Sequence, residues 1–342
     1  MEGTRFVHDP FSYKGRVEMR PQKSRVLASN RLEDPTEREV PVYLPPGWDE
    51  VGAQFPVIFM LAGFTGRGQN FLGSHPWKGS VVQTFDRAVA RGACPPAILV
   101  MPDCFTAMGG GQYINSAFMG RYEDYIMGEL VSFVDETYPT LPGRRGVIGK
   151  SSGGFGAMSL SMRYPEIFSA AASISGDCHF EYGYALEFLA ALRCLQASGG
   201  SPQGFLDGFY KRPILKGDDH ALLNTLAMSA CYSPALDQDL GFELPFDCHT
   251  GRRNESVWQR WLEFDPVYLV ESCAPAWRSL DFLHLEAGQS DEFHLQFGLR
   301  ILGQALERLE IPHRGGEFAG GHFDINHRYQ HILPSMIAAL AG

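Results

Sequence analysis

A glycine-flanked serine at the end of an apolar run constrains the fold of this chain more than any other feature. Residues 147–154 read Val-Ile-Gly-Lys-Ser-Ser-Gly-Gly, so Ser151 lies in the pattern Gly-x-Ser-x-Gly between a short apolar strand and a small-residue helix. A serine on such a sharp turn needs neighbours without side chains two positions away on each side, and Gly149 and Gly153 meet that need. The pattern predicts a nucleophile elbow, with Ser151 at the positive end of the helix, where developing negative charge is stabilised.

Two other interpretations of this motif stay open. Ser152 is a competing nucleophile, but Lys150 stands two residues before it, and a lysine fits the tight turn poorly. The second interpretation is a glycine-rich strand–helix turn with a buried structural serine. The strand before the motif, the helix after it and the next apolar strand favour Ser151 as a nucleophile.

Apolar runs and helical stretches alternate along most of the chain. Strands are expected at 39–44, 56–62, 97–101, 146–148, 170–175, 282–285 and 314–318, and helices near 79–91, 121–137, 153–163, 291–309 and 325–340. Strands that are apolar throughout and alternate with helices predict a mostly parallel sheet covered on both faces. The expected fold class is α/β, with a doubly wound sheet.

The alternation lapses between about residues 177 and 265, where aromatic residues fall in helical or irregular stretches without clear strands. An insertion after the strand that follows the elbow emerges at the carboxyl edge of the sheet, where ligands bind in such folds. We therefore expect one domain over residues 1–342, with a cap inserted at about 177–265.

The charge composition narrows the classes of partner that this chain is expected to bind. The 342 residues carry 29 basic and 39 acidic side chains, a net charge of −10, which disfavours nucleic acid and anionic membranes as partners. The first residues lack an apolar leader segment and no run of about 18 apolar residues occurs, so a soluble, cytoplasmic protein is expected, although a signal removed earlier would be invisible. The seven cysteines are scattered without a Cys-x-x-Cys pair, which argues against a structural zinc site and a fully paired disulfide framework.

A serine nucleophile needs a base and an acid that orients the base, in the chain order serine, acid, histidine. His322 lies in the flexible loop Ala-Gly-Gly-His-Phe after the last expected strand, where a base can reach the elbow. Asp291 lies in the turn after the penultimate strand, with Gly288 permitting that turn. The 31 residues between them accommodate one helix and one strand. These spacings predict Asp291 and His322 as the partners of Ser151.

Alternatives to these two residues also exist. Glu286 lies nearer the strand end, Glu292 could complement the dipole of the following helix, and Asp291 itself could be a helix N-cap. His327 and His331 are four residues apart on a helix, and with His322 and Asp324 they resemble a set of metal ligands. Surface histidines on an amphipathic C-terminal helix explain that pair more simply, so no metal is expected.

An oxyanion intermediate needs backbone N–H donors. The amide of Ser152 stands next to the nucleophile at the helix start. The second donor is expected in the glycine-rich loop 62–68, where the main chain can approach a substrate closely, and Phe64 is the residue chosen for it. A glycine-rich surface turn is the alternative for that loop.

Several of these pieces resemble the esterase D and enterochelin esterase-like branch of the α/β-hydrolases, which includes S-formylglutathione hydrolases, feruloyl esterases and mycolyltransferases. The matching stretches are 42–48, 61–65 with 70–71, 101–103, 110–113, 122–125, 149–154, 288–293 and 321–322. The resemblance implies a triad of Ser151, Asp291 and His322, oxyanion amides from Phe64 and Ser152, and no metal or organic cofactor.

The expected function is therefore a serine carboxylesterase that hydrolyses a small-molecule ester through an acyl-enzyme on Ser151. An acyltransferase or a thioesterase of the same fold, such as an S-formylglutathione hydrolase, is the first alternative. A non-catalytic hydrolase-like binding protein is the second. Assembly into a homo-oligomer stays open.

Overall fold

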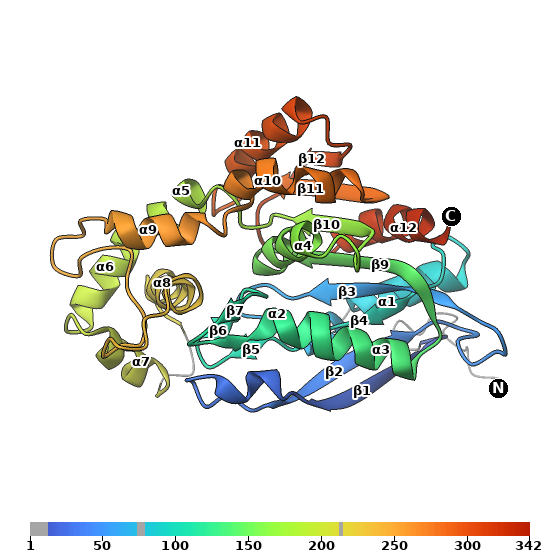
Figure 1. Cartoon of the computed structure of the whole chain (residues 1–342), viewed down its shortest axis with the longest axis horizontal. Coiled ribbons are helices and arrows are strands. Elements are labelled where there is room, and N and C mark those ends of the chain that lie inside the picture. Colours follow the sequence, from blue (N-terminus) through green and yellow to red (C-terminus); the bar gives the residue numbers. More distant parts are fainter. Residues whose placement is uncertain (1–12, 74–78, 212–214) are drawn as a thin grey trace, which may run out of the picture.

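One twisted sheet organises the molecule (Figure 1). Among residues 13–73, 79–211 and 215–342, which the computed structural model describes, eight strands form it in the order β1-β2-β4-β3-β9-β10-β11-β12. They are β1 (Arg16–Lys23), β2 (Glu37–Leu44), β3 (Phe55–Leu61), β4 (Ile98–Val100), β9 (Thr140–Lys150), β10 (Ala170–Ile174), β11 (Phe282–Gly288) and β12 (Arg314–Phe318). Strands β4 to β12 of this order run parallel, whereas β1 and β2 are antiparallel to their neighbours. The predicted doubly wound, mostly parallel sheet is confirmed.

Helices connect the strands. They are α1 (Val81–Ala90), α2 (Tyr122–Asp124), α3 (Val131–Thr137), α4 (Ser152–Arg163), α5 (Phe180–Gly183), α6 (Phe188–Ala197), α7 (Pro202–Phe209), α8 (Asp219–Tyr232), α9 (Glu255–Leu262), α10 (Pro266–Arg278), α11 (Leu295–Arg308) and α12 (Arg328–Ala341). A π-helical turn, η3 (Tyr125–Leu130), joins α2 to α3, and the 3₁₀ turns are η1 (Val26–Ser29), η2 (Gly68–Leu72) and η4 (Ala185–Glu187). Two small hairpins pair β5 (Phe105–Thr106) with β6 (Gly109–Gly110), and β7 (Asn115–Ser116) with β8 (Gly120–Arg121). No helix in the described ranges has the length and apolarity needed to cross a membrane.

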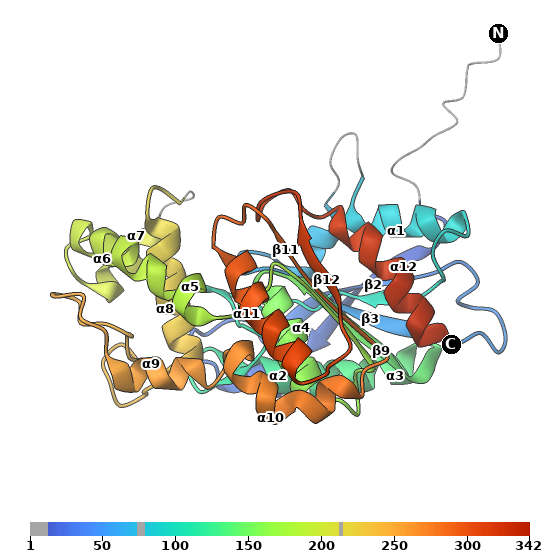
Figure 2. The same cartoon turned by 90° about the horizontal axis from the view of Figure 1, so that it is seen from above.

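Both faces of β3 and β4 are buried, which explains why these two strands are apolar at every position. In β3, Phe59 and Leu61 pack into a core with α3, α4, α10 and α11, whereas Ile58 and Met60 pack into a core with α1 and α12. Figure 2 shows α1 and α12 on one side of the sheet and α3 and α10 on the other. Packing on both faces of the sheet thus fixes the positions of its inner strands, whose carboxyl ends lead into the site.

The segment from α5 to α9 forms a third core beyond one end of the sheet (Figure 1). This core unites apolar residues of α6, α8 and α9 with Phe64 from the loop after β3 and Phe155 from α4. The sequence predicted helical or irregular structure here, and the described part of 177–265 is helical apart from loops and isolated bridges. Because this core includes residues of the sheet domain, the segment is packed onto that domain.

Strand β1 was not predicted from the sequence. It pairs with β2 along its whole length at the edge of the sheet, and its residues alternate between exposed and half-buried positions. An edge strand covered on one face carries charged residues, as Arg16, Glu18, Arg20 and Lys23 show. A search for strands that are apolar throughout therefore passes over it.

Candidate active site

Ser151 lies on the turn between β9 and α4. Its backbone has φ 58° and ψ −128°, a conformation that non-glycine residues avoid. The N–H of Ser151 donates to the carbonyl of Ile174 at 3.0 Å, and its carbonyl accepts from Phe155 N–H in the first turn of α4. These bonds to β10 and to the helix hold the strained residue in place.

The two flanking glycines are required by close backbone contacts. A Cβ on Gly149 would lie 2.2 Å from the carbonyl oxygen of Gly153, and a Cβ on Gly153 would lie 2.1 Å from the carbonyl oxygen of Leu61. Any side chain at either position would collide with the main chain of the elbow or of β3. The steric reason inferred from the sequence thus holds in the structure.

Asp291 and His322 meet although 31 residues separate them. His322 Nδ1 and Asp291 Oδ2 are 2.9 Å apart, and each residue is 3% exposed. Gly288 at the end of β11 permits the meeting, because a Cβ there would lie 2.5 Å from the carbonyl oxygen of Gly321. The loop that carries His322 therefore passes directly over the strand that leads to Asp291.

The surroundings of Asp291 keep its carboxylate charged. Burial by itself raises the pKa of Asp291, but hydrogen bonds and charge from His322, with further bonds from Ser175 and from Phe293 N–H, hold the pKa below its usual value. A charged Asp291 fixes the Nδ1–H tautomer of His322 and leaves Nε2 free to accept a proton.

The acidic alternatives to Asp291 have other partners. Glu286 forms a two-pronged ion pair with Arg328 of α12 at 2.7 and 2.6 Å, so it is engaged away from His322. Helix α11 begins at Leu295 with His294 in the left-handed conformation before it, so Asp291 is not an N-cap. Glu292 accepts from the backbone N–H of His322 at 2.6 Å rather than facing the helix. This support of the histidine loop was missed, although Glu292 directly follows Asp291.

Phe64 and Ser152, the two predicted oxyanion donors, lie in the loop after β3 and at the start of α4. Both residues line the same cavity as Ser151, and the first N–H groups of a helix, here that of Ser152, have no intrahelical partner. The N–H of Phe64 donates to none of the described residues, whereas its carbonyl accepts from Gly110 N–H at 2.6 Å. The loop after β3 is thus held by the hairpin of β5 and β6.

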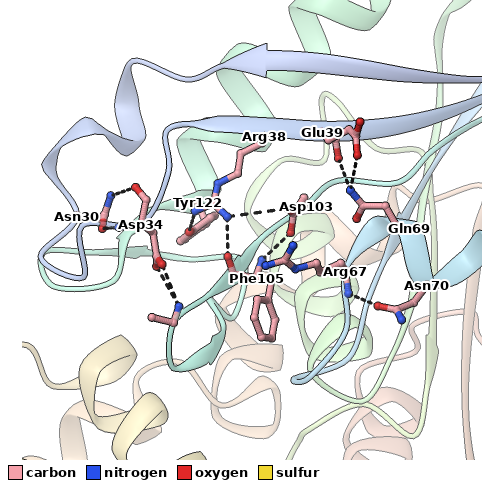
Figure 3. A network of polar contacts seen from close by, with 11 residues as sticks. Asn30, Asp34, Arg38, Glu39, Arg67, Gln69, Asn70, Asp103, Phe105 and Tyr122 are labelled. Atoms are coloured by element: carbon pink, nitrogen blue, oxygen red, sulfur yellow. Dashed lines mark hydrogen bonds and ion pairs between the residues drawn. The ribbon is translucent and has the colours of Figure 1, made fainter. Parts of the chain in front are cut away.

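A buried arginine supports that hairpin (Figure 3). Arg38 of β2 donates to the carbonyl of Phe105 at 2.6 Å and to the hydroxyl of Tyr122 at 2.7 Å, with Asp103 at 4.0 Å. Asp103 in turn accepts from Phe105 N–H at 3.1 Å. Charge-assisted bonds to a carbonyl are strong where water is excluded, so Arg38 stabilises the chain that carries Gly110.

A cavity of about 320 Å³ opens above Ser151. Ser151, His322 and the loop after β3 line it from the sheet domain, and residues of α5, η4 and α8 line it from the opposite side. Its further lining residues with charged, amide or imidazole side chains are Asn70, Lys150, Asp177, Glu187, His220, Asn224 and Asn326. Of these, His220 packs its ring against Phe64 and Phe293, and burial together with the nearby His322 lowers its pKa.

A buried polar chain lies next to the elbow. Gln112 Nε2 donates to Ser152 Oγ at 2.9 Å, Ser152 Oγ donates to Asp177 Oδ2 at 3.3 Å, and Tyr184 donates to the same oxygen at 2.9 Å. The sequence prediction missed Asp177, although a carboxylate directly after β10 could have been suspected at the carboxyl edge of the sheet.

The alternative metal site receives no geometric support. His327 and His331 are exposed, their ring centroids are 6.2 Å apart, and His327 Nδ1 contacts the carbonyl of Asp324. In the parts of the chain that the structure describes, no three His, Cys, Asp or Glu side chains are arranged to hold a metal ion.

Known proteins resemble this chain in sequence. It is 32% identical over 158 residues to the esterases Rv1288 and MT1326 of Mycobacterium tuberculosis, strains H37Rv and CDC 1551. The match covers 43% of this chain and 31% of each relative, so the chain spans about a third of the length of the curated relatives it matches.

Solved structures share its fold. A ferulic acid esterase superposes with a TM-score of 0.61 at 19% identity over 96% of this chain and 100% of its own. FphF, a fluorophosphonate-binding serine hydrolase of Staphylococcus aureus, gives 0.59 at 14% identity over 95% and 98%. An S-formylglutathione hydrolase of Agrobacterium tumefaciens gives 0.53 at 16% identity over 96% and 95%.

The model of the family described as "Putative esterase" matches residues 29–322, which include the elbow, Asp291 and His322. With the parallel sheet, the strained serine and the neighbours of the same fold, the expected fold class is confirmed. The chain belongs to this esterase family of the α/β-hydrolases.

Proposed function

We propose that this protein is a serine carboxylesterase that hydrolyses small-molecule esters through an acyl-enzyme on Ser151. One observation carries the proposal: His322, held by Asp291 at 2.9 Å, lines the same cavity as Ser151, which lies on the strained turn. The match to the esterase family supports ester hydrolysis as the reaction class.

In this mechanism His322 accepts the hydroxyl proton of Ser151 as its Oγ attacks the ester carbonyl carbon. The carbonyl oxygen becomes an oxyanion, to which the amides of Phe64 and Ser152 donate. When the C–O bond to the alcohol breaks, His322 returns the proton to the leaving alcohol. Water then attacks the acyl-enzyme with the same help, and the acid and free Ser151 are released.

The segment 177–265 serves in this proposal as a cap over the site. Its support is the position of Tyr184, Glu187 and Asn224, which line the cavity opposite the sheet domain. The cap thereby supplies much of the surface that a substrate touches, while the sheet domain supplies the reacting groups.

Ser151→Ala tests the nucleophile. It should lower kcat for p-nitrophenyl acetate by roughly four to six orders of magnitude and abolish labelling by a fluorophosphonate probe. Ser152→Ala is the matched control, because it keeps the backbone N–H; its loss should stay below the roughly 10²-fold that removal of an oxyanion donor costs. Circular dichroism spectra check that both variants fold.

His322→Ala should resemble Ser151→Ala, and His327→Ala, at an exposed position, should be nearly silent. Strong labelling of Ser151→Ala, or equal losses in the two histidine variants, would contradict the assignment. A folded wild-type protein that neither labels nor hydrolyses any ester would instead indicate a binding protein.

A further inference from the structure

The side chain of Asp177 lies in the wall of the cavity with its charge uncompensated. The residue follows β10 and is 8% exposed. Both of its hydrogen bonds, from Tyr184 and Ser152, end on Oδ2. Its second oxygen, Oδ1, accepts no hydrogen bond from the described residues, so it is available to a molecule in the cavity.

No lysine or arginine in the described part of the chain neutralises this carboxylate. Burial raises the pKa of Asp177 to about 6, against the opposing effects of the Tyr184 bond, the charge of His322 and the Ser152 bond. A buried carboxylate is normally paired with a cation, and an unpaired one costs free energy that only a cation can recover in full.

Glu187 adds a second negative charge to the lining of the cavity. It lies in η4, close along the chain to Tyr184, and its side chain caps no helix N–H. No described residue forms a hydrogen bond or an ion pair with its carboxylate. We call Asp177 and Glu187 the acidic wall.

Lys150, the one lysine among the described residues that line the cavity, is directed elsewhere. Lys150 Nζ lies 5.8 Å from the ring centroid of Phe323, and the carboxylates that act on its charge are Asp291, Asp324 and Glu292. These belong to the loops that carry the acid and the base. Among the residues that the structure describes, the acidic wall is therefore left without a lysine or arginine partner.

We propose that the acidic wall binds a cationic group of the substrate, so that the enzyme prefers esters with an ammonium group in the acyl or the alcohol part. A neutral hydroxyl could donate one hydrogen bond there, but it would not compensate two carboxylates. This inference rests on the proposed ester hydrolysis and adds the substrate class.

Two pairs of esters that differ only in charge test it. Acetylcholine is compared with 3,3-dimethylbutyl acetate for the alcohol side, and p-nitrophenyl 4-(trimethylammonio)butyrate with p-nitrophenyl 5,5-dimethylhexanoate for the acyl side. In at least one pair, kcat/KM of the cationic ester should exceed that of the neutral ester by about tenfold or more, the scale of one charge-assisted interaction. Choline, but not 3,3-dimethyl-1-butanol, should inhibit hydrolysis of the neutral esters competitively.

Variants of the acidic wall test whether its two carboxylates cause the preference for cationic esters. Asp177→Asn and Glu187→Gln should each reduce the ratio of cationic to neutral kcat/KM severalfold, mainly through KM of the cationic ester. Glu181→Gln is the matched control, because it removes a charge from α5 at a residue that does not line the cavity. The ratio of cationic to neutral kcat/KM in Glu181→Gln should equal that of the wild type.

Ratios near one in both pairs, with neutral esters still hydrolysed through Ser151, would overturn the inference and leave the esterase proposal intact. An equal loss on charged and neutral esters in Asp177→Asn would show that this residue only holds Ser152. If Asp177→Asn does not fold, Glu187→Gln and the choline inhibition still decide. Lack of turnover of every ester would instead refute the proposed function.

Discussion

At the scale of single residues, the elbow depends on two glycines that leave no room for a methyl group. The conformation of Ser151 is costly on its own, by about 1–3 kcal/mol, and it persists because β3, β10 and α4 surround it. The strained turn places Ser151 in the lining of the cavity, which His322 also lines.

Gly153→Ala should therefore disrupt both stability and activity. Its Cβ would lie 2.1 Å from the main chain of Leu61, so β3 or the elbow must move, at a cost of about 3 kcal/mol. Gly128→Ala is the matched control, because nothing lies within 4 Å of a Cβ there. Urea denaturation and ester hydrolysis measure the two effects, and a Gly153→Ala protein as stable and active as the wild type would contradict the steric account.

Single residues also show why much of this site could be predicted from short stretches of sequence. The glycine spacing, the loop position of His322 and the turn position of Asp291 are all visible within a few residues of sequence. Asp177 and Arg38 are not, because their importance comes from partners distant in the chain, such as Ser152 for Asp177 and Phe105 for Arg38.

At the scale of elements, one aspartate joins the two ends of the segment that contains α5 to α9. Asp265, fully buried, accepts from the N–H groups of His179 and Phe180 at the start of α5, and from Val267 N–H at the start of α10. The segment thus leaves the sheet domain and returns to it at one point, which fixes its base beside the cavity.

Asp265→Ala should destabilise this junction. Three N–H groups would lose their acceptor in a buried place, which costs roughly 3 kcal/mol or more in the free energy of unfolding. Asp247→Ala is the matched control: Asp247 also accepts from two N–H groups, His249 and Thr250, but at the surface, where water replaces it, so its loss should be much smaller. Equal losses in the two variants, measured by urea denaturation, would show that burial of the junction is unimportant.

The elements differ in how well the sequence predicted them. Inner strands and the helices that cover them were found because each is buried on a regular face, whereas β1 is an edge strand and α5 to α9 pack around a core of their own. Helix α10 was also not predicted, because Pro275 inside it interrupts the helical pattern. Pro266 at its first position is a helix start signal that the prediction did not use.

At the scale of the whole molecule, the acidic wall links the site to the pH dependence of stability. The pKa of Asp177 is about 6 in the folded protein against 3.8 ordinarily, so between these pH values the folded state binds a proton that the unfolded state releases. Stability from this group is therefore greatest below about pH 4 and is lost as pH rises through 6.

Asp177→Asn should remove that dependence. The stability of the variant relative to the wild type should rise between pH 4 and pH 8 by up to about 3 kcal/mol. Using the difference between the two proteins cancels the other carboxylates, including Asp265, whose pKa burial raises to about 7, and Asp291, whose pKa is lowered. Parallel stability curves for the two proteins, from thermal unfolding across this pH range, would contradict an uncompensated charge at Asp177.

The sequence by itself determined the elbow, the inner strands and the loop positions of Asp291 and His322. Steric demands of glycine and the burial of strands act within a few residues, so the sequence records them locally. Only the tertiary structure decided that Asp177 and Glu187 face the cavity, that Arg38 supports the loop of Phe64, and that Asp265 closes the segment. These depend on charges and hydrogen-bond partners brought together from distant parts of the chain, and no local pattern of residue types specifies which of them will meet.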